Sequence, residues 1–177
     1  MVSAVAVSSQ ESRAERLYAV EQEIWRVLER VPDPEIPVLS VVDLGIVRHV
    51  RVEEGGVRVG VSPTYSGCPA TEVIRSLIER QLRAAGFDAV RIEDVLSPPW
   101  SSDWISAEGR RKLKAFGIAP PEQSVSRVRH LFSAPQVSCP RCDSSRTERV
   151  SEFGSTPCKA HYRCLSCAEP FDHFKCI

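Results

Sequence analysis

The chain has no charge excess and no long hydrophobic run, and each absence excludes a class of function. Its 23 Lys and Arg residues balance 23 Asp and Glu residues, so the formal net charge is zero. A surface without a basic excess has little attraction for nucleic acid or for an anionic membrane. No apolar run approaches the roughly 20 residues that cross a bilayer. We therefore expect no nucleic acid and no membrane among its partners.

A secretory signal and a glycine-rich phosphate loop are also missing. Residues 1–10 lack a basic start and a long hydrophobic stretch, which indicates a frayed tail rather than a signal peptide. The seven cysteines are an odd number, and five of them fall within 29 residues. Without an export signal, this usage favours metal or redox chemistry over a disulfide framework. We expect a cytoplasmic protein.

The hydrophobic periodicity predicts an α/β (α+β) domain over residues 15–119, with a small mixed sheet and flanking helices. Helices are expected over residues 11–30, 70–85 and 106–116, and strands over 46–52, 57–61 and 88–96. Residues 120–137 are polar and flanked by prolines, which is typical of a linker. Residues 138–177 then form a second, cysteine-rich module, and we expect the two modules to have separate cores.

Cys68 lies at the predicted junction between a strand and a helix, in the stretch Pro63-Thr64-Tyr65-Ser66-Gly67-Cys68-Pro69. A helix N-terminus favours a thiolate, and thiolates bind metals and attack electrophiles. The alternative is a small buried cysteine that fills a corner of the core. The spacing alone favours neither.

Three carboxylates are candidate ligands or acid–base groups. Asp33 and Glu35 lie between prolines in a short loop, and Asp43 precedes the first expected strand. Acidic residues in such turns are more often solvated caps. A ligand role for Asp33, Glu35 or Asp43 therefore needs support from outside these turns.

Two of the three tryptophans, Trp100 and Trp104, fall in one proline-rich loop. Aromatic side chains on such a loop either cover the open end of a small sheet or anchor a partner protein. Both roles are compatible.

The last 40 residues predict a zinc ribbon. Two CxxC pairs, Cys139 with Cys142 and Cys164 with Cys167, are separated by 21 residues, which a long hairpin can absorb. Forty residues bury little core, so Zn²⁺ would supply much of the folding energy. Redox activity of the two pairs is the alternative, but the βαβ context of such a site is missing. Four further residues could replace one of these ligands, and the two cysteines among them could instead be free thiols. Because four cysteines complete the site, they are interpreted as its surroundings: Cys158, Cys176, His161 and His173.

Three segments of the first module resemble the small iron–sulfur assembly-factor family, which includes SufT-like proteins. They are residues 33–37, residues 42–47, and residues 63–69, which contain Cys68; Pro98-Pro99-Trp100 follows further along the chain. The resemblance implies that Cys68 contacts a metal or an Fe–S cluster, and it maps the acidic motif onto Asp33, Glu35 and Asp43. One cysteine cannot hold a cluster alone, so it also implies a site shared across a homodimer or with a client protein.

The zinc module is similar to that of the PaaD-like family, which serves the phenylacetyl-CoA epoxidase system. The similarity lies in residues 153–156, Cys158-Lys159-Ala160 and residues 169–172, together with residues 97–105. It implies an accessory role in phenylacetate catabolism, with structural Zn²⁺ and transient iron or an Fe–S cluster. The implied partners are the oxygenase or the reductase component of that system.

Two hypotheses of function follow. The first is a non-catalytic factor that assists metal-centre maturation of the oxygenase or the reductase. The second is a direct stoichiometric component of the oxygenase complex that uses Cys68 as a reactive thiol. A zinc-ribbon nucleic-acid binder is disfavoured by the neutral charge.

Overall fold

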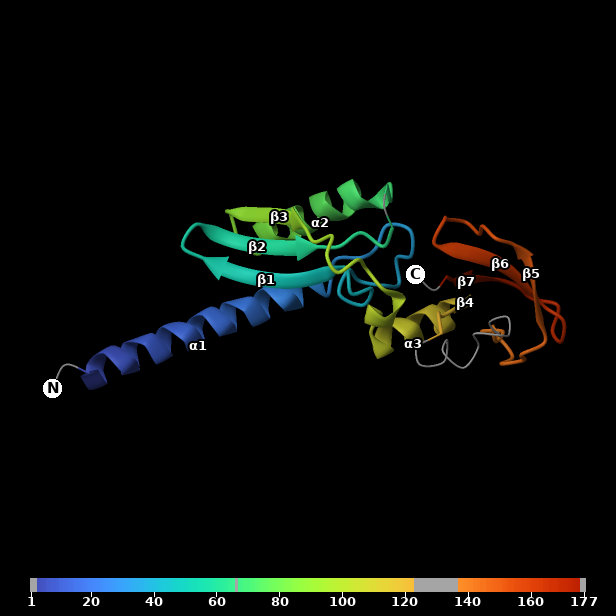
Figure 1. The fold of residues 1–177 in the computed structure, drawn as a ribbon, viewed down its shortest axis with the longest axis horizontal. Coiled ribbons are helices and arrows are strands. Elements are labelled where there is room, and N and C mark those ends of the chain that lie inside the picture. The colour runs from blue at the N-terminus through green and yellow to red at the C-terminus, as the bar shows by residue number, and fades with distance from the viewer. Residues whose placement is uncertain (1–2, 66, 123–136, 176–177) are drawn as a thin grey trace.

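The computed structural model describes residues 3–65, 67–122 and 137–175, with side chains from residue 13 onward (Figure 1). The elements of the first module are α1 (Ser3–Leu28), β1 (Val47–Glu53), β2 (Gly56–Val61), α2 (Ala70–Ala84), β3 (Val90–Asp94), a 3₁₀ turn (Ser102–Trp104), α3 (Ala107–Phe116) and β4 (Ile118–Ala119). The second module holds β5 (Thr147–Ser151), β6 (Lys159–Cys164) and β7 (Pro170–Phe174).

The first sheet has the order β1-β2-β3 and is mixed. β1 and β2 form an antiparallel hairpin, whereas β2 and β3 run parallel, with Val59 opposite Ile92. Parallel neighbours need a crossover connection, which α2 supplies. α1 packs on β1, α2 packs on β3, and the two helices touch each other. The predicted fold class is confirmed.

The helices follow local signals. α2 buries one stripe, Ala70, Ile74, Ile78 and Leu82, at the four-residue spacing of a helix face. α3 begins after Ser106, whose hydroxyl accepts a hydrogen bond from the Gly109 N–H at 2.8 Å, and it ends at Gly117 in the left-handed conformation. No described helix has the length and apolar character to cross a membrane.

The expectation of a frayed tail over residues 1–10 is wrong for the described part, because α1 begins at Ser3. Residues 3–28 contain neither proline nor glycine, so no residue interrupts the helix before the prolines that follow it.

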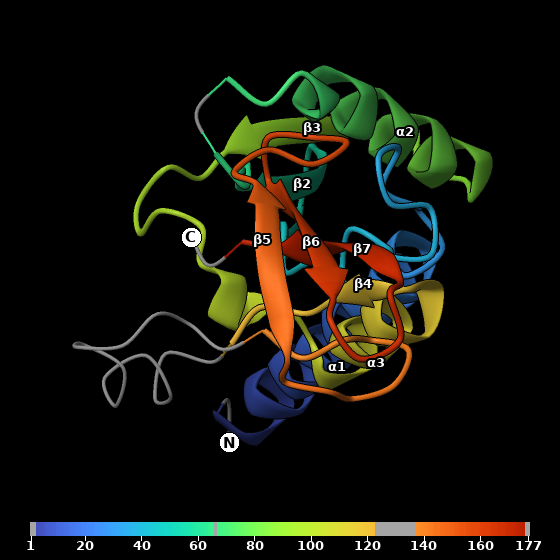
Figure 2. The ribbon, with the colours of Figure 1, turned by 90° about the vertical axis from the view of Figure 1, so that its right-hand side faces the viewer.

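The second sheet has the order β4-β7-β6-β5 (Figure 2). β5, β6 and β7 are antiparallel neighbours, and the β5–β6 hairpin absorbs the long gap between the two CxxC pairs, as predicted. β4 ends the first module, yet it pairs in parallel with β7, with Ile118 opposite Asp172. The sheet of the ribbon therefore includes a strand from the α/β module.

The two modules do not have separate cores. Phe174 and Cys158 of the ribbon belong to the core of the first module, where they are 1% and 4% exposed. The Phe174 ring lies 6.1 Å from the Trp100 ring. The ribbon keeps a small core of its own, lined by Ala119, Val137, Cys139, Ala160, Tyr162, Cys164 and Phe171. A 40-residue module buries too little apolar surface alone, and packing against its neighbour adds the rest. Most of the expected linker, residues 123–136, lies outside the described residues.

The two tryptophans of the proline-rich loop have different roles. Trp100 is 4% exposed, and its indole N–H donates to the Leu44 carbonyl at 2.9 Å, so it covers the end of the sheet as predicted. Its burial removes it as an anchor for a partner. Trp104 is half-buried under the Arg48 guanidinium, 3.3 Å from its ring centroid. Its role as a client contact stays a prediction.

We expect Phe174→Ala to destabilise the first module as well as the ribbon, by about 3–5 kcal/mol, because a buried aromatic ring is lost. Urea unfolding followed by tryptophan fluorescence measures this, since all three tryptophans precede residue 119. Phe153→Ala is the matched control, because that ring is 65% exposed and its removal should change stability by no more than about 0.5 kcal/mol. Equal, small effects of the two variants would contradict the shared core.

Candidate functional site

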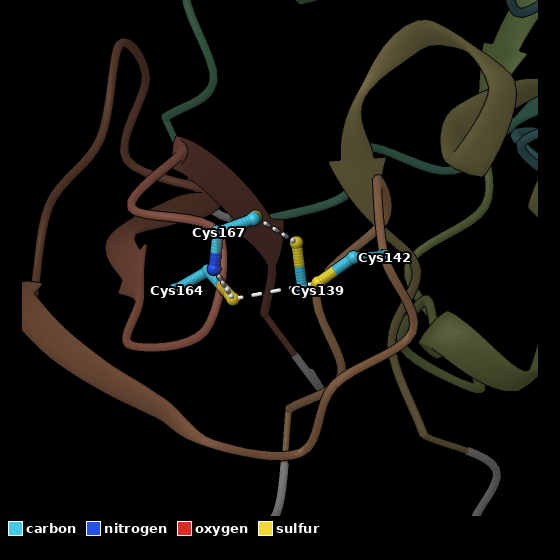
Figure 3. Close-up of side chains that lie close together, drawn as sticks. All are labelled: Cys139, Cys142, Cys164 and Cys167. Carbon is cyan, nitrogen blue, oxygen red and sulfur yellow. Dashed lines mark hydrogen bonds between the residues drawn. The ribbon is translucent and has the colours of Figure 1, made fainter.

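The two CxxC pairs meet in one cluster of four sulfurs (Figure 3). The Sγ atoms of Cys139 and Cys167 lie 3.7 Å apart, those of Cys142 and Cys164 lie 3.6 Å apart, and all four are within 4.8 Å of one another. A tetrahedron with Zn–S bonds of about 2.3 Å has sulfur–sulfur edges of about 3.8 Å. The donor set and its spacing therefore fit Zn²⁺.

Both pairs adopt the same backbone turn. The Cys139 N–H donates to the Ser144 carbonyl and the Cys164 N–H to the Glu169 carbonyl, each at 2.9 Å. The residue after each pair, Asp143 or Ala168, has a positive φ of about 60°. Two matching turns present two sulfurs each to a common point. This explains why the CxxC spacing alone predicted the cluster.

Backbone N–H groups support the thiolate of Cys164. The Cys167 and Ser166 N–H groups donate to its Sγ at 3.5 and 3.4 Å. These bonds, the one from Cys167 first, lower the pKa of the Cys164 thiol to about 6. The Cys142 and Cys167 thiols of the same cluster have raised pKa values, so among these three thiols only Cys164 ionises readily.

A second group of reactive side chains surrounds Cys68, which lies between β2 and α2. The preceding Gly67 has φ of +81°, a conformation that favours glycine, and the following Pro69 caps α2 with φ of −66°. This turn leaves Cys68 half-buried and packed against the main core. Cys68 thus stands at a helix N-terminus, as the sequence indicates.

The loop of Asp33 folds back beside Cys68. The Asp33 Oδ1 atom accepts hydrogen bonds from the N–H groups of Glu35 and Ile36, at 2.9 and 2.7 Å. This bonding holds the loop as a compact turn and buries Asp33. Asp33, Glu35 and Cys68 all line one cavity of about 20 Å³, so the structure brings three of the four predicted ligands together.

Cys158 of the ribbon lines the same cavity, a position that the sequence did not predict for it. Its thiol donates to Glu35 Oε2 at 3.9 Å and lies 3.0 Å from the Thr156 hydroxyl. The sequence offered one indication of a separate role: the two CxxC pairs already supply four zinc ligands, which leaves Cys158 as an additional thiol. Its place beside Glu35 depends on a contact between residues 123 positions apart in the chain.

Burial disfavours charge on the groups around this cavity. Burial raises the pKa of the Asp33 and Glu35 carboxyls, although nearby Lys159 acts the other way on both. Burial likewise raises the pKa of the Cys158 thiol. The pKa of Tyr65 rises to about 12, through burial first and then through the adjacent Cys68 thiol. The charge on each of these groups therefore changes the pKa of its neighbours in the cavity.

Asp43, the fourth predicted ligand, does not line this cavity. Its carboxylate accepts hydrogen bonds from the Ser40 hydroxyl at 3.0 Å and from the Lys112 ammonium at 2.7 Å. Burial opposes ionisation of Asp43, but Lys112 and Ser40 together lower its pKa. Asp43 joins its own loop to α3, as a capping residue would.

The two histidines of the ribbon lie outside the four-cysteine cluster. His161 Nδ1 is 3.2 Å from Asp172 Oδ1, and the buried His173 ring packs edge-on to Tyr162. Neither histidine therefore belongs to the described set of four ligands, and their role as surroundings of the site stays a prediction. Cys176 lies outside the described residues.

Two family models match the chain, one in each module. The model described as "Iron-sulfur cluster assembly protein" matches residues 21–93, and the model described as "PaaD zinc beta ribbon domain" matches residues 123–175. A protein of Escherichia coli (strain K12), provisionally named as a subunit of 1,2-phenylacetyl-CoA epoxidase, is 49% identical over 155 residues, which cover 88% of this chain and 92% of that protein.

The chain belongs to the PaaD-like family of phenylacetyl-CoA epoxidase subunits. Its first module has shorter relatives. A Porphyromonas gingivalis (strain ATCC BAA-308 / W83) protein named Fe-S protein maturation auxiliary factor is 36% identical, over 52% of this PaaD-like chain and 90% of that protein. A crystal structure of a DUF59 domain from Bacillus anthracis superposes with a TM-score of 0.53, at 28% identity, over 56% of this chain and 96% of that one.

We predict one Zn²⁺ per chain on the four ribbon cysteines of this PaaD-like protein. Cys139→Ser should lower the zinc content well below one equivalent and unfold the ribbon, because the metal holds both turns together. Elemental analysis of protein purified without added metal measures this. Ser155→Ala, in the β5–β6 loop outside the cluster, is the control and should retain its zinc. Full zinc retention by Cys139→Ser would show that the ligand set is different.

Glu35→Gln should maintain or raise the stability of the fold, whereas Asp43→Asn should lower it by about 1–2 kcal/mol. The raised pKa of Glu35 means that its ionised form disfavours folding, so the advantage of Glu35→Gln should grow as the pH rises above the ordinary value of 4.5. The lowered pKa of Asp43 has the opposite sign, and its contribution is lost as the pH falls. Urea unfolding at pH 4 and pH 7 tests both. Loss of stability in Glu35→Gln at pH 7 would contradict this electrostatic account.

Proposed function

We propose that the chain is a non-catalytic accessory factor that assists insertion of iron or an Fe–S cluster into a component of the phenylacetyl-CoA epoxidase system. The observation that carries this proposal is the cavity at which Cys68 meets Asp33 and Glu35. The two relatives named above support both halves of the proposal, one by its Fe–S maturation name and the other by its epoxidase name.

The chemistry of the cavity suits temporary binding of a metal. A thiol and two carboxylates are ligand groups for iron, and their charges disfavour an empty, ionised site. Among the described residues that line the cavity there is no histidine, so the thiol–imidazole pair of a typical cysteine nucleophile is not formed there. Binding of cargo therefore accounts for the side chains better than covalent catalysis does.

The role of the ribbon in this proposal is structural. A Zn²⁺ ion on its four cysteines would hold β5, β6 and β7 in place, and β7 packs into the core beside the cavity. The client would be the oxygenase or the reductase component. A homodimer and a cytoplasmic location remain predictions.

A second function has one observation in its favour. The E. coli relative is named as part of the epoxidase, which suits a protein that joins the oxygenase as a stoichiometric component. In that case Cys68 would act as a reactive thiol within the complex.

Reconstitution distinguishes the two functions. Oxygenase and reductase components purified with their full complement of iron and flavin should turn over phenylacetyl-CoA without this chain, because a maturation factor is dispensable once the metal is in place. Components made in cells that lack the chain should be present in normal amounts but depleted in iron, as measured by elemental analysis.

Variants provide the control in cells. Cys68→Ser should reproduce the iron depletion, whereas Glu72→Gln, an exposed change in the first turn of α2, should not. A stoichiometric requirement for the chain by fully loaded components would overturn the maturation role and establish the direct-component role.

A further inference from the structure

Cys158 is a thiol that the zinc ribbon does not use for its own metal. It precedes β6 and is 4% exposed, away from the four-sulfur cluster. Its backbone carbonyl accepts a hydrogen bond from the Lys175 N–H at 2.9 Å, and its Sγ contacts the Thr156 hydroxyl. The ribbon therefore holds Cys158 firmly at the cavity wall, opposite the loop of the first module that carries Glu35.

The acidic side chains at this wall have no direct cationic partner. Within the described residues, neither Asp33 nor Glu35 has a Lys, Arg or His nitrogen within 4.0 Å. The buried Lys159 ammonium lies 3.9 Å from Asp172 and acts on the two cavity carboxyls only from a greater distance. The buried Asp33 accepts two backbone N–H groups, and the half-buried Glu35 accepts the Cys158 thiol. A bound cation would add the opposite charge that these contacts do not supply.

The size of the cavity selects the kind of cation. Its volume of about 20 Å³ exceeds the roughly 10–15 Å³ that one water molecule needs, so the cavity accommodates a single ion. Two thiols combined with carboxylates form a mixed soft and hard donor set, which suits a borderline divalent transition-metal ion. Purely hard ions such as Mg²⁺ and Ca²⁺ prefer all-oxygen sites.

We propose that Cys158 and Cys68 are the two thiolate ligands of a single Fe²⁺ ion, with Glu35 as a carboxylate ligand and Asp33 beside it. This inference rests on the proposed function, and it assigns the ribbon a direct part in the site. Among the described residues only the four ribbon cysteines have all their ligand atoms within 4.8 Å of one another, so binding of Fe²⁺ at the cavity would require rotamer changes of its ligands. The ribbon completes a site for which the first module alone supplies one thiol.

The arrangement also couples the two metal sites. The β5–β6 hairpin carries Cys158 near one end and the zinc ligand Cys164 at the other, at opposite ends of β6. Zinc at the ribbon fixes β6, and β6 fixes Cys158. Release of iron to a client then needs only a displacement of the ribbon edge, because that movement removes one of the two thiolates.

Anaerobic Fe²⁺ binding to the full chain, loaded beforehand with one equivalent of zinc, tests this proposal. Wild type should retain one iron per chain after desalting. Cys68→Ser and Cys158→Ser should each weaken Fe²⁺ binding by about tenfold or more, with zinc unchanged at one equivalent. Ser155→Ala, in the same loop as Cys158 but bonded to Asp172, is the matched control and should bind iron as wild type does.

X-ray absorption at the iron edge of the wild-type protein gives a readout that needs no variant. Two sulfur ligands are expected, and one or none would overturn the proposal even if Cys158→Ser failed to fold. Unchanged Fe²⁺ affinity in a folded Cys158→Ser protein would also overturn it. Neither result would contradict the proposed maturation role, because the reconstitution experiment tests that role separately. Absence of Fe²⁺ binding to wild type would reject the iron site.

Discussion

The packing of β7 and the β5–β6 loop against the first module is the contact on which the rest of the structure depends. Phe174 fills the end of the main core beside Trp100, and Cys158 reaches the cavity of Cys68 from the same side. β4 strengthens this contact by adding a strand of the first module to the sheet of the ribbon. Because the ribbon is too small to bury a large core, we expect its stability to depend on two supports: the four-cysteine cluster, which fits Zn²⁺, and this interface.

The two cysteine sites differ in how the chain builds them. The four-sulfur cluster is made locally, from two matching CxxC turns that hydrogen bonds hold in the same conformation. The cavity site is assembled from the loop of Asp33, the strand–helix junction of Cys68 and the ribbon loop of Cys158. A site assembled from three distant segments is easily opened by moving one of them. That property suits the proposed release of a metal to a client.

The carboxylates show how similar residues acquire different roles. Asp43 is paired with Lys112 and Ser40, its pKa is lowered, and it stabilises the fold. Burial first, and then the nearby Asp33 carboxylate, raise the pKa of Glu35 against the opposing effects of Lys159 and the Cys158 thiol, so its charge disfavours the fold. Perturbed carboxyls in a cavity are candidates for function, which separates Asp33 and Glu35 from the structural cap Asp43.

The sequence by itself determined the elements that depend on neighbours in the chain. Periodicity located the central helix and the strands, the Ser106 and Gly117 signals bounded α3, and the CxxC spacing identified the zinc cluster, because each of these rests on contacts within a few residues or one hairpin. Only the tertiary structure decided that the modules share a core, that Trp100 is buried and that Cys158 lines the same cavity as Cys68. These facts depend on contacts between segments far apart in the chain, such as the 56 positions between Leu44 and Trp100 and the 123 between Glu35 and Cys158. No local pattern of residue types encodes which distant surface a side chain meets.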